Sequence, residues 1–452
     1  MLGKSEDTIL GKKECNFFWF DRLTILGEVE RLIGILLEGD IMSGKDKKLN
    51  RRQFFKVAGG AGAASILASQ KGLAEVADPN AAKEEVKPAY PQIGKRVLGK
   101  TGKEVPELGL GLMFNVEENQ LILHKSLEWG VNYWDTAWGY ANGTSELGIG
   151  KFFKRQPEKR KDVFLVSKAS RTDNAAEVEE RLQESLQRMN VSYIDVYYLH
   201  NIESTERLNN ELRDWAKSAK DRGLIGGFGF TSHGNITECL NFASKLEWID
   251  VIMHSYNFRL MQDKELNAAM DACHKAGIGL VAMKTQGQKQ KSFDTDADKQ
   301  IVEYFLSRGL TEGQAKIKAV LGDDRISCAC VGMKSVSVLT SNVAGVLDEG
   351  KLADGDVAAL LNYAEQTCDG YCAGCSTICR DAVGMGYVSD VMRYLMYYNS
   401  YGDKERAKEL FNEIPADVRG KLARMDYSKA ERMCPQGLAI GELMKEAVSK
   451  LS

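Results

Sequence analysis

The sequence predicts an α/β protein in which a (β/α)8 TIM barrel is followed by a small, mostly helical C-terminal domain. Short β-branched or aromatic runs recur eight times through the middle of the chain, and stretches with helical periodicity separate them. Several of these runs are almost continuously apolar, which is typical of parallel strands buried on both faces. Eight such units in about 240 residues match a TIM barrel better than an open doubly wound sheet.

The predicted strands and helices follow in order along the chain. The strands cover residues 108–112, 131–137, 163–169, 193–200, 225–231, 251–256, 278–284 and 326–332. Between the third and fourth strands, residues 176–189 place Val178, Leu182 and Leu186 on one helical face. We therefore expect the barrel to span residues 93–345 and the C-terminal domain residues 346–452. Within the latter, residues 388–398 and 404–411 are predicted to be helical.

The composition excludes two classes of protein. The chain has 452 residues, enough for two or three domains, and 44% of them are hydrophobic. Its 60 basic and 63 acidic side chains are mixed along the sequence, so no basic face is available for nucleic acid. No uncharged apolar run reaches the roughly eighteen residues of a membrane-spanning helix, which argues against a polytopic membrane protein.

The N-terminal region has the layout of an export signal. Residues 42–77 place six Lys or Arg before a charge-free run rich in Ala and Gly, and the pair Arg51 and Arg52 resembles a twin-arginine signal. This resemblance implies the bacterial twin-arginine export machinery as a partner and a periplasmic location, or a membrane tether if the signal stays uncleaved. We interpret residues 1–41 as a misannotated upstream extension and residues 78–92 as a linker.

Four polar residues stand where predicted strands end. Asp135 and Tyr140 come at or after the end of the second strand, Lys168 ends the third, and His200 ends the fourth. In a TIM barrel the carboxyl ends of the strands meet at one mouth, where the chemistry takes place. Each residue alone has a structural explanation, but four at successive strand ends predict a catalytic group.

These segments resemble the aldo-keto reductase family over roughly residues 93–345. The resemblance rests on D-T-A-x-x-Y at 135–140, the strand-ending lysine, Y-I-D-x-Y-Y-L-H at 193–200, the Gly-rich fifth strand I-G-G-F-G-F-T-S-H, and a late G-M-K-S, which occur in family order. It implies a barrel that binds NADPH or NADH across its mouth and reduces a small-molecule carbonyl to an alcohol.

The chemistry of the four residues agrees with that implication. Hydride addition to a carbonyl carbon leaves an alkoxide-like oxygen that needs a proton. Tyr140 would donate it, and we expect the nearby Lys168 ammonium to lower the tyrosine pKa. Asp135 would hold Lys168 in place, and His200 would orient the carbonyl oxygen with a second hydrogen bond.

The resemblance also implies cofactor-binding residues. They are Thr231, Ser232, Lys284, Gly332, Lys334, Ser335 and Asn342. Lys334 and Ser335 match positions that contact the adenosine phosphate, which favours NADPH over NADH. Ser232 and Met253 stand where the family uses Asn and Gln, so the sequence predicts a remodelled clamp around the nicotinamide carboxamide.

Five of the ten cysteines lie in the last 85 residues, at positions 368, 372, 375, 379 and 434. A tight run of thiols completed by a distant Cys-Pro is closer to a 4Fe-4S site than to the paired C-x-x-C elements of zinc fingers. The run also resembles the ferredoxin-like extension behind some aldo-keto reductase barrels. The predicted ligands are Cys372, Cys375, Cys379 and Cys434. Cys368 in place of Cys379, and structural zinc in place of the cluster, are the alternatives.

Two functional hypotheses follow from the sequence. The first is an NAD(P)H-dependent carbonyl reductase that carries an iron–sulfur cluster. The second is a catalytically altered barrel that serves as a binding or regulatory protein, or exchanges electrons with a redox partner through its cluster. The intact set of Asp135, Tyr140, Lys168 and His200 favours the first hypothesis, whereas Ser232 and Met253 favour the second.

Overall fold

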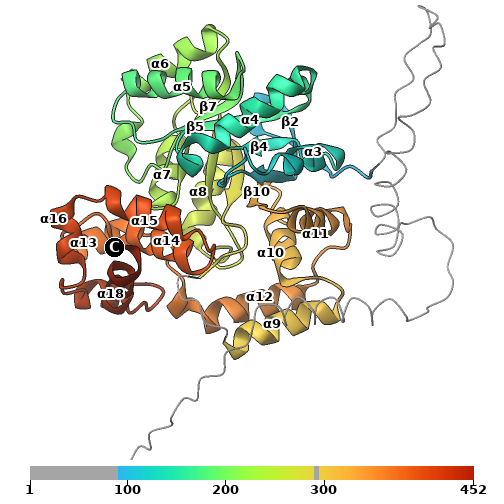
Figure 1. Ribbon diagram of the computed structural model, residues 1–452. Helices are drawn as coiled ribbons and strands as arrows, with labels where there is room; N and C mark the ends of the chain where they lie inside the picture. The colour runs from blue at the N-terminus through green and yellow to red at the C-terminus, as the bar shows by residue number, and fades with distance from the viewer. Residues whose placement is uncertain (1–89, 290–294) are drawn as a thin grey trace, which may run out of the picture. The chain divides into compact units, whose positions relative to one another are not determined.

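A computed structural model describes residues 90–289 and 295–452 of the chain (Figure 1). The predicted upstream extension, the export signal and residues 78–89 of the linker lie outside these described residues. The described residues all belong to one compact unit, Val86–Ser452. No helix in the described part is long and apolar enough to cross a membrane.

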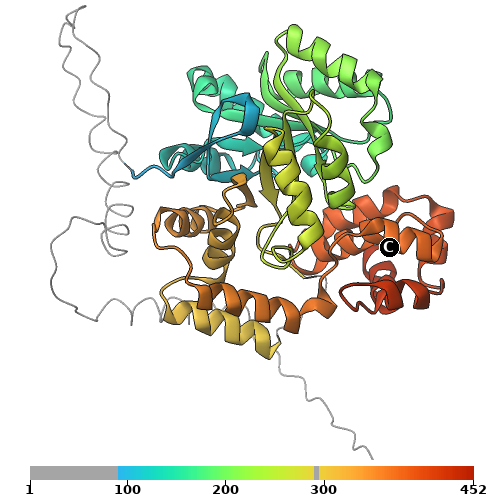
Figure 2. The same cartoon turned by 180° about the vertical axis from the view of Figure 1, so that it is seen from behind.

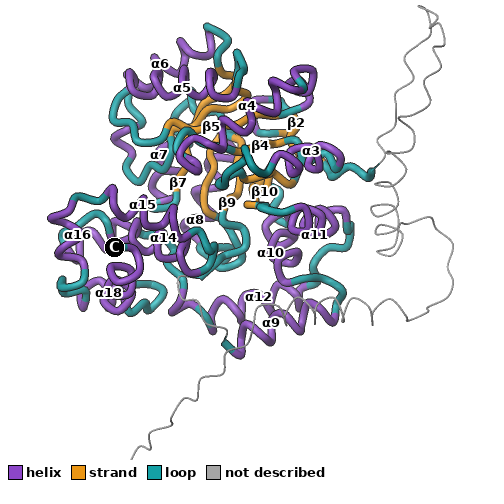
Figure 3. The backbone as a smooth tube through the Cα atoms, viewed as in Figure 1, coloured by secondary structure: helices purple, strands orange, loops and turns teal. Residues whose placement is uncertain are grey.

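Among the described residues, eight parallel strands close into a barrel in the order β10-β3-β4-β5-β6-β7-β8-β9 (Figure 3). The strands are β3 (Leu108–Gly111), β4 (Tyr133–Asp135), β5 (Phe164–Ala169), β6 (Ile194–Leu199), β7 (Ile225–Ser232), β8 (Val251–Ser255), β9 (Gly279–Met283) and β10 (Ile326–Gly332). An antiparallel hairpin of β1 (Lys95–Val97) and β2 (Glu104–Pro106) precedes them. Side chains such as Val166, Tyr198 and Val281 fill the barrel interior. The predicted TIM-type barrel is confirmed.

Helices and short 3-10 turns connect the strands. The helices are α3 (Gln120–Glu128), α4 (Thr144–Arg155), α5 (Ala175–Met189), α6 (Asn210–Asp221), α7 (Ile236–Ala243), α8 (Lys264–Lys275), α9 (Asp296–Ser307), α10 (Glu312–Leu321) and α11 (Val336–Leu347). The turns are η2 (Gly99–Thr101), η3 (Tyr140–Gly143), η4 (Pro157–Asp162) and η5 (Thr205–Arg207). Helix α5 follows the predicted pattern: the Asn174 side chain caps it, and Val178, Leu182 and Leu186 are buried against the barrel.

Helices and loops make up the remainder of the chain. They are α12 (Asp354–Gln366), η6 (Cys368–Gly370), α13 (Ser376–Val383), α14 (Val388–Asn399), α15 (Lys404–Glu413), α16 (Ala416–Leu422), α17 (Ser428–Met433) and α18 (Ile440–Leu451). Helix α12 packs along α9, and the later helices gather beside the barrel (Figure 2). Residues such as Leu395, Phe411 and Met444 give these later helices a hydrophobic core separate from the barrel interior.

The C-terminal helical region contacts the carboxyl end of the barrel. The Asn235 amide, in the loop after β7, donates a 3.1 Å hydrogen bond to the Gly374 carbonyl, and the Asn235 side chain accepts from the Thr377 amide at 3.0 Å. After β8, the Asn257 side chain donates to the Tyr371 hydroxyl at 3.1 Å. The segment around Cys372 is therefore held against the mouth where the predicted catalytic residues lie.

Candidate active site

The structure brings the four residues predicted from the strand ends together. Lys168 Nζ lies 2.7 Å from the Asp135 carboxylate and 3.4 Å from the Tyr140 hydroxyl, and it donates to the Thr136 carbonyl at 2.7 Å. The Tyr140 and His200 rings meet edge to face, with centroids 5.7 Å apart. These residues come from β4, η3, β5 and the end of β6, so the closure of the barrel assembles them.

The lysine and the aspartate form a buried ion pair. Their side chains are only 1% and 5% exposed, and an uncompensated charge at that depth would be strongly unfavourable. The pair fixes Lys168 by direct bonds to Asp135 and to the Thr136 backbone. The ammonium is therefore held in place without any ligand.

A strained turn positions the tyrosine. Tyr140 begins η3, in which Ala141 and Asn142 both adopt left-handed backbone conformations, with φ of 48° and 53°. Such conformations are costly for residues other than glycine and cluster at functional sites. The Asn142 side chain donates to Glu409 of α15 at 2.8 Å, so the C-terminal region helps to hold this turn.

The pKa of Tyr140 is raised well above its usual value, and burial is the largest cause. The negative charge of Asp135 and the neighbouring Tyr397 hydroxyl raise it further, and Arg406 only partly offsets them. The expectation of a lowered pKa is therefore wrong for this structure, because burial and the charge of Asp135 outweigh the effect of the nearby ammonium. Tyr140 stays a neutral phenol at neutral pH, a form that can donate a hydrogen bond.

His200 is also held neutral. Burial, followed by the positive charges of Lys168 and Arg393, lowers its pKa well below the usual value. Its Nδ1 lies 2.6 Å from the Ser170 hydroxyl. When Ser170 donates to Nδ1, the imidazole proton resides on Nε2, which is then available to a substrate oxygen. Sequence reasoning missed Ser170, although its position two residues after Lys168 on an extended segment could have indicated it.

The two hydroxyls predicted to clamp the nicotinamide carboxamide are already bonded to the backbone. Thr231 Oγ1 accepts from the Asn201 amide at 2.8 Å, and Ser232 Oγ donates to the Gly234 carbonyl at 2.7 Å. Met253, the apolar replacement on β8, is buried in the barrel interior. These contacts agree with a remodelled clamp.

Lys284 contacts the C-terminal region. It follows β9 with a left-handed backbone, φ 57°, and its ammonium lies over the rings of Tyr397 and Tyr401, 4.3 and 4.7 Å from their centroids. Burial raises the pKa of Tyr397, but the nearby Lys284 and Arg393 outweigh burial, and the pKa lies below its usual value. Lys284 is therefore engaged with α14 at the site predicted for the cofactor.

The residues predicted to contact the adenosine phosphate lie at the end of β10 and on α11. Gly332 is exposed, and the Lys334 side chain is 47% exposed, 4.0 Å from Asp403. Ser335 caps the N-terminus of α11. Asn342 is buried, and among the described residues its Nδ2 has no hydrogen-bond partner. This part of the predicted cofactor site is more open than the nicotinamide part.

A cavity of about 40 Å³ lies between the mouth and the C-terminal region. Its barrel side includes His233, Ser255 and Lys284, and its C-terminal side includes Cys372 and Arg393. Cavities that hold organic ligands are typically several hundred cubic ångströms, so this one has room for only a few water molecules.

Four cysteines line one further cavity. They are Cys372, Cys375, Cys379 and Cys434, the four predicted ligands, and Cys368 is not among the lining residues. Apolar side chains such as Met392 and Leu438 make up most of the remaining wall, together with the polar Ser389 and Gln436. Burial raises the pKa of the Cys379 thiol to about 12. Among residues 90–289 and 295–452, no three His, Cys, Asp or Glu side chains are grouped so that they could hold a metal ion.

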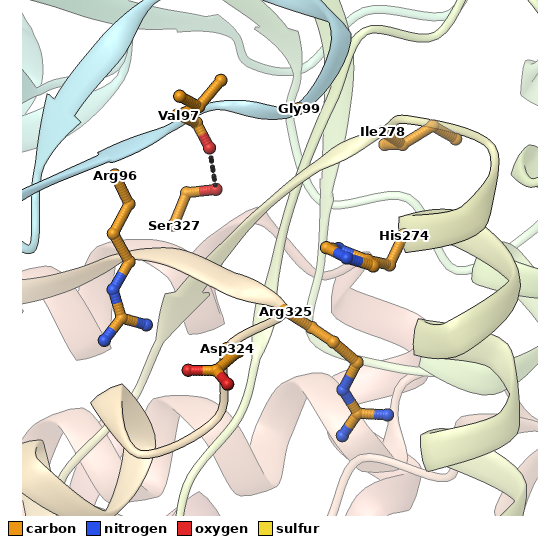
Figure 4. A pocket seen from close by; sticks show the side chains of 8 residues that line it. All are labelled: Arg96, Val97, Gly99, His274, Ile278, Asp324, Arg325 and Ser327. Atoms are coloured by element: carbon orange, nitrogen blue, oxygen red, sulfur yellow. Dashed lines mark hydrogen bonds between the residues drawn. The ribbon is translucent and has the colours of Figure 1, made fainter.

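A larger cavity, of about 500 Å³, lies at the opposite end of the barrel (Figure 4). It is lined by residues of β1, such as Arg96, and by residues at the amino ends of β9 and β10, such as Arg325. Both guanidinium groups are already paired: Arg96 with Glu107 at 2.8 Å, and Arg325 with Asp271 and Asp323. Size alone does not make this the active site, because the catalytic set lies at the other end.

Comparisons with known proteins agree with the position of the site. The model of the Aldo/keto reductase family matches residues 107–311, which include all four mouth residues. The comparisons support an oxidoreductase of the aldo-keto reductase type. The barrel region is 24% identical to an uncharacterized oxidoreductase of Bacillus subtilis, over 60% of this chain and 97% of that protein. It is 26% identical to L-galactose dehydrogenase of Arabidopsis thaliana, over 57% of this chain and 89% of that protein.

Solved structures support the fold of this oxidoreductase. An aldo-keto reductase from Bacillus halodurans in its holo form has a TM-score of 0.51 and 22% identity, covering 60% of this chain and 96% of its own. A thermostable aldo-keto reductase in complex with the inhibitor epalrestat has a TM-score of 0.50 and 24% identity, with 60% and 100% coverage. At these identities the likeness supports the barrel alone.

Proposed function

We propose that the enzyme reduces the carbonyl group of a small molecule to an alcohol, with Tyr140 as the proton donor. The observation that carries this proposal is the position of Lys168 Nζ, 2.7 Å from the Asp135 carboxylate and 3.4 Å from the Tyr140 hydroxyl. As hydride reaches the carbonyl carbon, negative charge develops on the oxygen, and a neutral phenol beside an ammonium can both stabilise that charge and supply the proton.

The neighbouring groups position the substrate and hold the charges. His200, kept neutral and bonded through Nδ1 to Ser170, would donate from Nε2 to the carbonyl oxygen. Lys168 would stabilise the phenolate that remains after proton transfer, and Asp135 keeps Lys168 in position. Burial strengthens these interactions because water does not screen them.

We propose that NADPH is the source of the hydride. A reduced nicotinamide supplies a hydride ion when it is bound. The half-exposed Lys334 and the helix-capping Ser335 would hold the adenosine phosphate, beside the exposed backbone of Gly332. Thr231, Ser232, Lys284 and Asn342 remain the predicted contacts to the rest of the cofactor. The match to the Aldo/keto reductase family supports this choice of cofactor.

We further propose a 4Fe-4S cluster held by Cys372, Cys375, Cys379 and Cys434. The support is that these four thiols share one cavity and that most of its remaining wall is apolar. Thiolate ligands in an apolar surrounding are the chemistry that an iron–sulfur cluster requires. Zinc in the same place is the alternative outcome of a metal analysis.

The location of the enzyme is also a proposal. The twin-arginine pair in residues 42–77 supports export of the folded protein to the periplasm, with the cluster inserted beforehand. Detection of the protein in periplasmic and membrane fractions, compared with an Arg51→Lys/Arg52→Lys variant, tests it. Retention of that variant in the cytoplasm is the expected result, and unchanged export would contradict the signal.

Replacement of Tyr140 tests the proposed reaction. Tyr140→Phe removes the donor hydroxyl, and we expect carbonyl turnover to fall by about 10²–10⁴-fold while cofactor affinity changes little. Suitable substrates are short hydroxyaldehydes and 2-oxoaldehydes, since the relatives include an L-glyceraldehyde 3-phosphate reductase and a methylglyoxal reductase. Tyr193→Phe, at the amino end of β6, is a matched control. Equal activity of Tyr140→Phe and the wild type on a verified substrate would refute the assignment.

A second function has its own supporting observation. On the nicotinamide side of the mouth only a cavity of about 40 Å³ remains, and the two hydroxyls predicted to clamp the nicotinamide bond to the backbone. This favours a barrel that binds or regulates, or that passes electrons through the cluster to a redox partner. Absence of NADPH oxidation with the whole substrate panel, combined with reversible reduction of the metal-loaded protein, would support this function over the first.

A further inference from the structure

We propose that Tyr371–Gly374, here called the cysteine cap, occupies the place of the nicotinamide and must move before the cofactor binds fully. This inference rests on the proposed function, because it concerns how the same site admits NADPH. The cap belongs to the C-terminal region but lies against the loops that follow β7 and β8. It is therefore an autoinhibitory contact formed by the chain itself.

The cap is anchored by specific bonds. The Gly374 carbonyl accepts from the Asn235 amide at 3.1 Å, and the Tyr371 hydroxyl accepts from the Asn257 side chain at 3.1 Å. Gly374 fits so closely that a Cβ on it would lie 2.1 Å from the His233 carbonyl oxygen, and its φ is 82°. Glycine is required at this position because both the space and the backbone conformation exclude other residues.

The cap and a nicotinamide ring compete for the same space. A hydride donor must come within about 3–3.5 Å of the carbonyl carbon, which itself must lie beside Tyr140 and His200. The approach from β7–β9 is closed by the cap, and Tyr397 with Lys284 closes the neighbouring side. The remaining 40 Å³ cannot hold a nicotinamide ring.

The other half of the predicted cofactor site lacks such a cover. Gly332 is exposed, open space surrounds a Cβ built on it, and the Lys334 side chain is 47% exposed. The adenosine half can therefore bind with the cap in place, whereas the nicotinamide half binds only to the open state. The apparent affinity of the whole cofactor is then reduced by the fraction of molecules that are open.

The cap is also part of the cysteine cavity. Cys372 and Ala373 line both this cavity and the cavity at the barrel mouth. Displacement of the cap therefore moves one of the proposed cluster ligands. Opening of the mouth and the state of the cluster are linked through Cys372, so a ligand that opens the mouth perturbs the cluster environment.

One variant loosens the segment that follows the cap, without changing a predicted catalytic or cofactor residue and without removing the backbone bond from Asn235 to Gly374. The Asn235 side chain accepts from the Thr377 amide and donates to the Glu203 carbonyl, at 3.0 and 2.9 Å. Asn235→Gly removes these bonds, and glycine tolerates the left-handed backbone at this position, φ 49°. Asn190→Gly is the matched control, because Asn190 is also left-handed, φ 53°, and caps the far end of α5.

The test measures the dissociation constants of NADPH and of its adenosine fragment, 2′-phospho-ADP-ribose, by calorimetric titration of the full metal-loaded chain. For the wild type we expect the two dissociation constants to agree within about threefold, because the nicotinamide adds nothing while the cap is closed. For Asn235→Gly we expect NADPH to bind about tenfold more tightly, with the fragment unchanged. Asn190→Gly should match the wild type.

Hydrogen exchange gives a second readout, since in Asn235→Gly NADPH but not the fragment should increase exchange at residues 371–374. Wild-type binding of NADPH far more tightly than the fragment, with no gain in Asn235→Gly, would overturn the cap and leave the proposed function intact. Failure of every form to bind either ligand would overturn both the cap and the proposed cofactor.

Discussion

The barrel mouth and the cysteine cavity bury their polar groups in opposite ways. At the mouth, Lys168 and Asp135 compensate one another at 2.7 Å, and His200 is neutral, so the site is stable without a ligand. In the cysteine cavity, thiols such as Cys379 face apolar side chains, and burial disfavours their thiolate form. The first site is organised by folding alone, whereas the metal that we propose for the second would have to bind thiols that burial keeps protonated.

The largest expected effect separates the cysteines of the cavity from their neighbour. Cys375→Ser removes a proposed ligand, and we expect loss of the iron and of the absorbance near about 400 nm. Cys368→Ser is the matched control, because Cys368 does not line the cavity and its replacement should leave the iron in place. Iron analysis of anaerobically purified protein measures both. Loss of iron in Cys368→Ser, with retention in Cys379→Ser, would favour the alternative ligand set.

The next effect tests whether the mouth is stabilised by its own charges. Asp135→Asn leaves the Lys168 ammonium buried without its partner, and we expect the free energy of unfolding to fall by about 3–5 kcal/mol. Urea denaturation measures the loss. The double variant Asp135→Asn/Lys168→Met should recover most of it, because the uncompensated charge is then removed. A single variant as stable as the wild type would mean that the pair is not the element that stabilises the site.

The barrel and the catalytic set are predictable from the sequence because both depend on short-range patterns. The apolar runs locate β5 at 163–169, and the observed strand is Phe164–Ala169. Strand ends in a barrel meet at one mouth, so the pattern of strands alone places Lys168 and His200 together. The same reasoning places a helix at 388–398, where the chain forms Val388–Asn399.

Features that depend on long-range packing could not be predicted. The bond between Asn235 and Gly374 joins residues that no local pattern relates. The pKa of Tyr140 depends on burial and on several charges together, so the presence of Lys168 in the sequence indicates the wrong direction. The closed mouth results from the docking of the C-terminal region, about which the strand periodicity contains no information.

A smaller effect concerns Ser170, which we expect to position His200. Ser170→Ala removes the hydroxyl 2.6 Å from Nδ1, so the imidazole loses the bond that keeps its proton on Nε2. We expect kcat to fall by about tenfold with little change in KM, because the hydrogen bond to the carbonyl oxygen matters most as charge develops. Ser170→Thr retains the hydroxyl and should restore most of the rate. Equal loss in both variants would indicate a packing role instead.

The smallest expected effect concerns the pH dependence of kcat/KM, which we expect neither to rise nor to fall around neutral pH. An acid with a raised pKa loses its proton only at higher pH, and a base with a lowered pKa gains one only at lower pH. Because Tyr140 is shifted up from 10.0 and His200 down from 6.5, kcat/KM should be flat between those two values. The profile is measured with a verified carbonyl substrate at constant ionic strength.

The same profile distinguishes a sealed mouth from an open one. In Asn235→Gly, water reaches the mouth more often, desolvation of both groups decreases, and the two limbs should move inward, toward pH 6.5 and 10.0. If the kcat/KM of the wild type already decreases between pH 6.5 and 10.0, Tyr140 and His200 titrate as solvated groups. The working geometry of the mouth would then form only after a ligand has bound.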